Sequence, residues 1–200
     1  MAVLLDIVTS VMIGGYIILM SFGILDSTNR FIYSHNDDLI VQQNLTAITR
    51  TLEFDLKKVG FAIPEHEDVV LLADTAHLRM RGDINRDWQP DTIEYYVGPV
   101  SEMSHTKHPH DRILYRKING NPNTGMRIGV VTQFNFQYLD QDRNFVDITN
   151  SFNWKKIKMV RTTLMVENSA AYSDKQNPDP DEYRTAFWQE TDLVSRNLRR

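Results

Sequence analysis

The stretch that most constrains the fold is an uncharged run near the amino terminus, IVTSVMIGGYIILMSFGIL, from Ile7 to Leu25. At ~1.5 Å of rise per residue, a helix over this run is roughly 28 Å long, which matches the hydrocarbon core of a bilayer. Asp6 lies immediately before the run, and the first basic residue is Arg30. The sequence therefore predicts an apolar transmembrane helix over residues 1–25 that carries a soluble remainder.

A cleaved secretory signal is the alternative interpretation of residues 1–25. Such signals begin with basic residues, have a shorter apolar core and end at a small-residue cleavage site, whereas no Lys or Arg precedes this run. Cytoplasmic Lys or Arg residues normally orient a membrane helix. Two explanations stay open: a basic leader is removed from the precursor, or the protein inserts by an unusual route.

Composition excludes several classes of function. The chain has no cysteine, so it has no disulfide framework, thiolate metal site or cysteine nucleophile. Its formal net charge is −4 and is spread along the chain, whereas a nucleic-acid binder shows a basic face. The sequence contains no nucleophile elbow, zinc-binding HExxH helix or glycine-rich phosphate loop. We therefore expect neither an enzyme nor a nucleic-acid partner.

A second helical pattern follows the apolar run. Apolar residues recur at spacings of three and four, which places them on one face of a helix: Leu45, Ile48, Leu52, Leu56 and Val59. Gly60 is the predicted stop, with Pro64 just beyond it. We expect residues 26–60 to continue the first helix and to pack this face on a sheet. An interruption near residues 26–36 stays open.

The residues from 61 to 200 carry the alternation and turn residues of antiparallel strands. Strands are predicted at 69–72, 77–81, 92–97, 112–118, 130–139, 156–166 and within 184–198. Residues 140–144 predict a hairpin loop and residues 173–182 a polar surface loop. The loops are too short for helical crossovers. The expected fold class is α+β, a long N-terminal helix packed on an antiparallel β-sheet head over residues 61–200.

In this order, the segments of the chain resemble the type IV pilin-like proteins, most closely the minor pseudopilins of the PilW/PulJ type. The residues that carry the resemblance are AVLLDIVTSVMIGGYIIL, RTLEFDLKKVGF, DTAHLRMRGDIN, RILYRKINGN, FQYLDQDRNF, IKMVRTTLMVE and LVSRNL. Together they cover most of the chain. The resemblance implies a pilin-like fold and assembly into a filament whose core is made of the N-terminal helices.

The resemblance also implies partners and a site. A prepilin peptidase would remove a basic leader in the bacterial inner membrane, the new amino terminus would be methylated, and an assembly platform would recruit the subunit from the lipid. In the family an acid near the mature amino terminus pairs with a neighbouring subunit, and Asp6 is the candidate here. Counted from Ala2, Asp6 has the family's position; counted from Met1, it lies one residue late. The family's leader glycine, its Phe-Thr-Leu run and its glutamate are not in this sequence.

Three further sets of residues are candidates. Gly14 and Gly15 either allow close approach of neighbouring helices or are ordinary membrane-helix glycines. Oxygen-bearing side chains at calcium-loop spacing, ending in a bidentate acid, would suit one Ca²⁺: Asp83, Asn85, Asp87, Gln89, Asp91 and Glu94. Trp88 replaces the glycine of such loops, so a polar hairpin loop is the preferred interpretation. The histidines of SHTKHPHD, residues 104–111, are interpreted as solvated loop residues rather than a metal site.

These observations predict a structural subunit of a type IV pilus or pseudopilus. Its head would face the periplasm before assembly and be displayed on a periplasmic or extracellular filament afterwards. The alternative is a single-pass, membrane-anchored binding or adhesin module that does not polymerise. The two interpretations differ in whether Asp6 is needed.

Overall fold

The structure of the chain, a computed structural model, describes residues 2–64, 66–106, 108–120, 125–167 and 187–193. The chain divides into two compact units, Met1–Ile40 and Val41–Arg200. The polar loop predicted at residues 173–182 lies outside the described residues.

The long helix α1 runs from Ala2 to Lys58. The interruption left open near residues 26–36 does not occur, because this stretch contains no proline and the Arg30 guanidinium reaches the Asp26 carboxylate one turn earlier, at 3.0 Å. The helix ends where the sequence predicts, with two lysines in its last turn and Gly60 at a φ of 75°. Glycine occupies this left-handed conformation at no steric cost.

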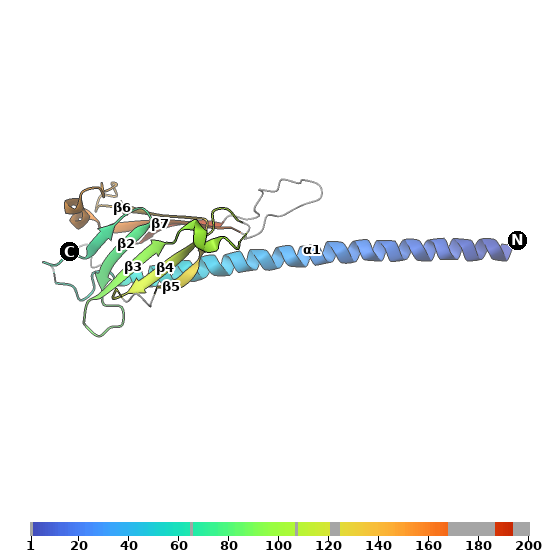
Figure 1. Cartoon of the computed structure of the whole chain (residues 1–200), viewed down its shortest axis with the longest axis horizontal. Coiled ribbons are helices and arrows are strands. Elements are labelled where there is room, and N and C mark those ends of the chain that lie inside the picture. Colours follow the sequence, from blue (N-terminus) through green and yellow to red (C-terminus); the bar gives the residue numbers. More distant parts are fainter. Residues whose placement is uncertain (1, 65, 107, 121–124, 168–186, 194–200) are drawn as a thin grey trace. The chain divides into compact units, whose positions relative to one another are not determined.

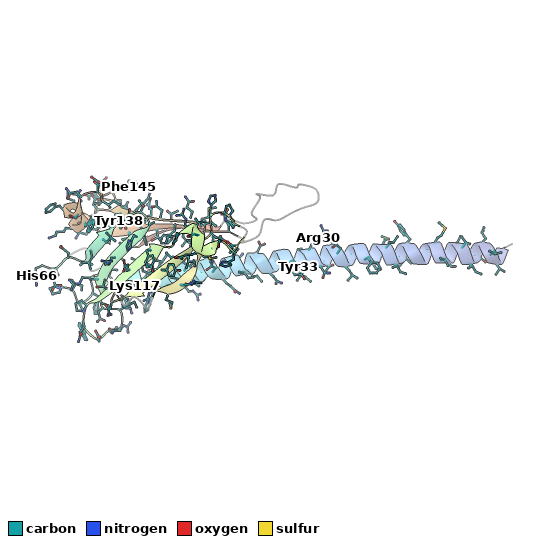
Figure 2. The ribbon with its side chains drawn as sticks, viewed as in Figure 1. Arg30, Tyr33, His66, Lys117, Tyr138 and Phe145 are labelled. Atoms are coloured by element: carbon teal, nitrogen blue, oxygen red, sulfur yellow. The ribbon has the colours of Figure 1, made fainter. Side chains whose placement is uncertain are left out.

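The first unit is the bare part of α1. Figure 2 labels Arg30 and Tyr33 in this part of the helix, and Tyr33 is 71% exposed. The packing expected from residue 26 onward begins only at Val41, whose side chain is 4% exposed. The stretch 26–40 therefore belongs with the uncovered part of the helix.

In the second unit, the described strands form two antiparallel sheets (Figure 1). The five-stranded sheet runs in chain order through β1 (Val70–Ala73), β2 (His77–Gly82), β3 (Asp91–Val97), β4 (Arg112–Ile118) and β5 (Met126–Val131). The three-stranded sheet contains β6 (Gln133–Leu139), β7 (Met159–Val166) and β8 (Phe187–Leu193). Two short 3₁₀ helices, η1 (Val100–Met103) and η2 (Ser151–Lys156), lie in the connections. The α+β class is thus confirmed.

One strand prediction is wrong. Residues 130–139 were expected to be a single strand, but the chain leaves the first sheet at Val131 and enters the second at Gln133. Thr132 lies between the strands, and its backbone N–H donates to the Met165 carbonyl of β7 at 3.0 Å. A bond to the next sheet at this point redirects the chain, although side-chain alternation continues through it.

The core joins the last turns of α1 to both sheets. The predicted helical face is buried, with Ile48, Leu52 and Leu56 at most 3% exposed. The aromatic residues of β6 complete the cluster, because Phe136 and Tyr138 are also buried and Phe134 packs against them. The Tyr138 hydroxyl donates to the Asp74 carbonyl at 2.7 Å, which ties the second sheet to the β1–β2 turn.

A buried ion pair fastens α1 to the five-stranded sheet. The Asp55 carboxylate is fully buried and receives a fork from Arg116, with Nε to Oδ2 at 2.5 Å and Nη2 to Oδ1 at 2.9 Å. Tyr95, which lies opposite Arg116 in the β3–β4 register, donates its hydroxyl to the same carboxylate. Burial, followed by the adjacent Asp55 charge, raises the pKa of Tyr95 well above its usual range. The phenol therefore stays protonated and acts as a donor.

Candidate functional site

The largest uncovered apolar surface lies on the first unit. The segment α1 is long and apolar enough to cross a membrane, and its most apolar window has a mean hydropathy of 2.2 with no part buried. Large apolar side chains around the whole helix from Val3 to Leu25 are at least half exposed. A helix that is apolar on all sides requires an apolar environment from outside the chain.

Two hydroxyl groups within this apolar segment are satisfied inside the helix. The Thr9 hydroxyl donates to the Leu5 carbonyl and the Ser21 hydroxyl to the Ile17 carbonyl, both at 2.9 Å. Such bonds remove the penalty of an unsatisfied hydroxyl in a hydrocarbon environment. Thr9 and Ser21 are therefore compatible with burial in lipid or between helices.

Asp6 is the exception in this segment. Its side chain is exposed, and no side chain of the described residues pairs with its carboxylate. A carboxylate next to an apolar span is costly to bury unless it gains a partner. Of the other predicted assembly residues, Ala2 begins α1, and Met1 lies outside the described residues.

The helix glycines make no contact that would require a missing side chain. A Cβ placed on Gly14, Gly15 or Gly23 meets no atom within 4 Å. Glycine is also a poor helix former. The fold of this chain therefore gives no reason for glycine at these positions. Gly23 is a third position, besides Gly14 and Gly15, at which the helix backbone is not covered by a side chain.

The predicted calcium loop is folded around its own carboxylates. Asp83 is buried, its Oδ1 accepts the N–H groups of Arg86 and Asp87, and its Oδ2 accepts that of Trp88 at 3.0 Å. The Asn85 side chain accepts the backbone N–H of Asp87, and the Asp87 side chain accepts the backbone N–H of Gln89. The loop uses these oxygens to hold its own backbone.

Glu94, the predicted bidentate ligand, lies in β3 rather than in the loop. Its Oε1 accepts from His77 Nε2 at 2.7 Å and from Arg79 Nη2 at 2.8 Å. Burial raises the pKa of Glu94, but these two hydrogen-bonded partners outweigh burial and hold the pKa below its usual range. The structure thus places Asp83, Asn85, Asp87 and Gln89 together and engages Glu94 elsewhere. In the described ranges, no group of three or more His, Asp or Glu side chains is arranged to hold a metal ion.

The histidine-rich loop is only partly solvated. His105 and His110 are exposed, as expected, but His108 is 4% exposed and lies beside Asp111, which is 1% exposed. His108 Nε2 lies 3.1 Å from Glu167 Oε2, at the end of β7. Sequence reasoning missed this cluster because Glu167 is far away along the chain.

An open hollow is a further candidate. It has a volume of about 960 Å³ and lies between residues 60–71 and the segment from η2 to Lys158. Its two walls are linked by an ion pair between Asp68 Oδ1 and Lys155 Nζ at 3.2 Å. Phe152 in the lining is 83% exposed. The volume lies in the range of small-molecule sites.

Comparison with known proteins adds no relative: no protein-family model, curated protein or solved structure matches the chain.

Proposed function

We propose that this protein is a structural subunit of a type IV pilus or pseudopilus, anchored in a membrane by α1 before it assembles. One observation carries the proposal: α1 has more uncovered apolar surface than a membrane anchor needs. A single span uses about 20 residues. Between Leu25 and the first packed residue, Val41, five more large apolar side chains are at least half exposed: Phe31, Ile32, Tyr33, Leu39 and Ile40.

Neighbouring copies of the same helix are the occupants that suit this surface. Lipid covers residues 3–25 equally well in an anchor and in a precursor subunit, but it does not explain residues 31–40. Burying apolar side chains stabilises by about 25 cal/mol per Å², so a bundle of such helices gains from covering both stretches. The bare glycines of α1 suit close helix approach in the same bundle.

Asp6 supplies a register for this assembly. A buried carboxylate is tolerated only where a partner neutralises it, and the amino terminus of a neighbouring copy is the cation that the pilin-like resemblance implies. The same resemblance suggests a prepilin peptidase, an inner-membrane assembly platform and a periplasmic head. Under this proposal the head is displayed on the filament and contacts other minor subunits.

The test compares Asp6→Ala with Asp26→Ala and Asp6→Glu in cells that assemble filaments. Mass spectrometry of sheared filaments and of membranes measures where each variant accumulates. We expect Asp6→Ala to accumulate in membranes but to be depleted from filaments about tenfold or more. The amino terminus of the neighbouring copy would be buried without its partner, which costs more than 1.4 kcal/mol. The other two variants should assemble. An N-terminal peptide with an N-methyl group would support processing.

A second candidate is an anchored binding module that never polymerises. The hollow between residues 60–71 and η2 is the observation that favours it, because its volume and exposed aromatic rim suit a small ligand. Recovery of the chain only in the membrane fraction, with an unmodified amino terminus, would favour this module over the filament subunit.

A further inference from the structure

The carboxylate of Asp111 is buried, and no described residue donates a hydrogen bond to it. Its side chain is 1% exposed, and neither Oδ1 nor Oδ2 has a hydrogen-bond partner in the part of the chain that the structure describes. Asp111 ends the loop of residues 104–111 that leads from η1 into β4. An ionised carboxylate in this position loses its hydration without any replacement. Its environment therefore favours the uptake of a proton or of another cation.

The imidazole of His108 lies beside this carboxylate but offers it no proton. His108 Nδ1 is 3.7 Å from Asp111 Oδ1, and the same nitrogen accepts the backbone N–H of His110 at 3.1 Å. A ring nitrogen that accepts a hydrogen bond carries no proton. The ring proton is then on Nε2, which lies 3.1 Å from Glu167 Oε2. His108 thus separates two carboxylates that belong to different sheets.

Among the described residues, the other charged groups around Asp111 do not compensate its charge. Burial raises the pKa of Asp111 more than the Thr106 hydroxyl and the His108 ring lower it, while Glu167 raises this pKa further and His105 lowers it least. The single hydroxyl proton of Thr106 is donated to the Met103 carbonyl at 2.8 Å. A proton is the smallest cation that satisfies the site without moving the sheets.

We propose that Asp111, His108 and Glu167 form a proton-operated latch between the loop of residues 104–111 and the end of β7. One added proton between Asp111 Oδ1 and His108 Nδ1 converts their contact into a hydrogen bond. The line Glu167–His108–Asp111 is then continuous from one sheet to the other, and its charge falls from −2 to −1. The His110 N–H, in an exposed loop residue, transfers its bond to water.

The sign of the pH effect follows from the direction of the Asp111 shift. A carboxyl group whose pKa is raised by folding binds its proton more tightly in the folded state. Its stabilising contribution is complete below the ordinary value of 3.8 and is lost as the pH rises through the raised value. The latch is therefore more firmly closed at low pH and opens as the pH rises. This behaviour does not depend on filament assembly.

Hydrogen-exchange mass spectrometry of the full chain in detergent tests the latch. After correction for intrinsic exchange, protection of residues 104–111 should rise by about twofold or more as the pH falls from 8 to 4, because each pKa unit of an upward shift is worth up to tenfold. In Asp111→Asn the side-chain amide donates to His108 at every pH, so protection should be high and independent of pH. The matched control Asp142→Asn, in the exposed hairpin loop, should keep the wild-type response.

Three results would overturn the latch. The first is a flat wild-type profile, which decides the question even if Asp111→Asn does not accumulate. The second is an Asp111→Asn profile that keeps the wild-type pH response. The third is a pH response that disappears when Zn²⁺ is added and returns with a chelator, because the site would then bind a metal cation in place of a proton.

Discussion

At the scale of single residues, the head depends on charges placed inside its core. The Asp55 carboxylate from α1, which is fully buried, meets Arg116 of β4 and Tyr95 of β3. Removing one partner of such an ion pair leaves the other charge buried and uncompensated. The three residues therefore fix how the last turns of α1 lie on the sheet.

Asp55→Ala should destabilise the head by about 3–5 kcal/mol, because the Arg116 guanidinium loses its buried counter-ion. Tyr95→Phe keeps the ion pair and removes one hydrogen bond, so it should cost only about 1 kcal/mol. Urea unfolding followed by near-UV circular dichroism measures both. Equal losses for the two variants would show that the ion pair adds nothing beyond the hydrogen bond.

Glu94 should make the head less stable in acid. Folding lowers the pKa of Glu94 through Arg79 and His77, so its contribution is present above the ordinary value of 4.5 and is lost as the pH falls through the lowered value. Glu94→Gln should flatten the acid side of a melting-temperature profile. An unchanged acid side would rule out this role. The change of stability with pH is opposite in sign to that expected for Asp111, because folding lowers the pKa of Glu94 and raises the pKa of Asp111.

At the scale of elements, local patterns in the sequence predict most of the described fold. The helical face from Leu45 to Val59 and the alternation in β2 each reflect burial on one side, which periodicity reports directly. The division at Thr132 was missed because a switch between sheets depends on a backbone bond to Met165, and alternation carries no record of it. The uninterrupted α1 was left open because Asp26 to Asn29 resemble a turn in composition alone.

For the candidate sites too, local sequence patterns do not report contacts made by the tertiary fold. Asp83 was singled out for its oxygens, but spacing does not reveal that backbone N–H groups occupy them. Glu94 lies beside Arg79 and His77 only through the β2–β3 register. Glu167 meets His108 across more than fifty residues of sequence. Contacts of this kind arise from the tertiary fold, and a single sequence carries no local signal of them.

Gly129→Ala should disturb the packing of α1 on β5. A Cβ at this position would lie 2.6 Å from Ile48 Cδ1 and would also meet Asn44 Oδ1. Ile48 is fully buried, so it has little room to move, and overpacking of this kind costs about 1–3 kcal/mol. Thermal unfolding measures the loss. Gly14→Ala, where a Cβ meets nothing, is the matched control and should leave head stability unchanged.

At the scale of the whole molecule, the two units need different environments to cover their apolar side chains. The head has its own core of helix and sheets. The first unit has uncovered apolar side chains for most of its length and depends on lipid or on other chains. Variants in the first unit should therefore change assembly without changing the unfolding of the head.

Ile32→Glu tests this separation. Ile32 lies beyond the predicted span and is 50% exposed, so head unfolding and membrane recovery should match the wild type. A carboxylate introduced between packed helices is strongly unfavourable, and recovery in sheared filaments should fall by about tenfold or more. Asn36→Glu is the matched control, because it adds the same negative charge at another exposed position of the same stretch and replaces a polar side chain instead of an apolar one. Equal recovery of both variants would contradict helix packing through residues 31–40.

The loop around Asp83 has a consequence for how this protein can diverge. Arg86 and Trp88 have positive φ angles of 67° and 65°, yet both side chains point outward and Trp88 is 75% exposed. The shape of the loop depends mainly on the buried Asp83 carboxylate, with help from Asn85 and Asp87, and these side chains bind backbone N–H groups, which every residue except proline possesses. Selection can therefore exchange the displayed side chains between lineages while Asp83 remains constant, so the loop can acquire new surfaces without a new fold.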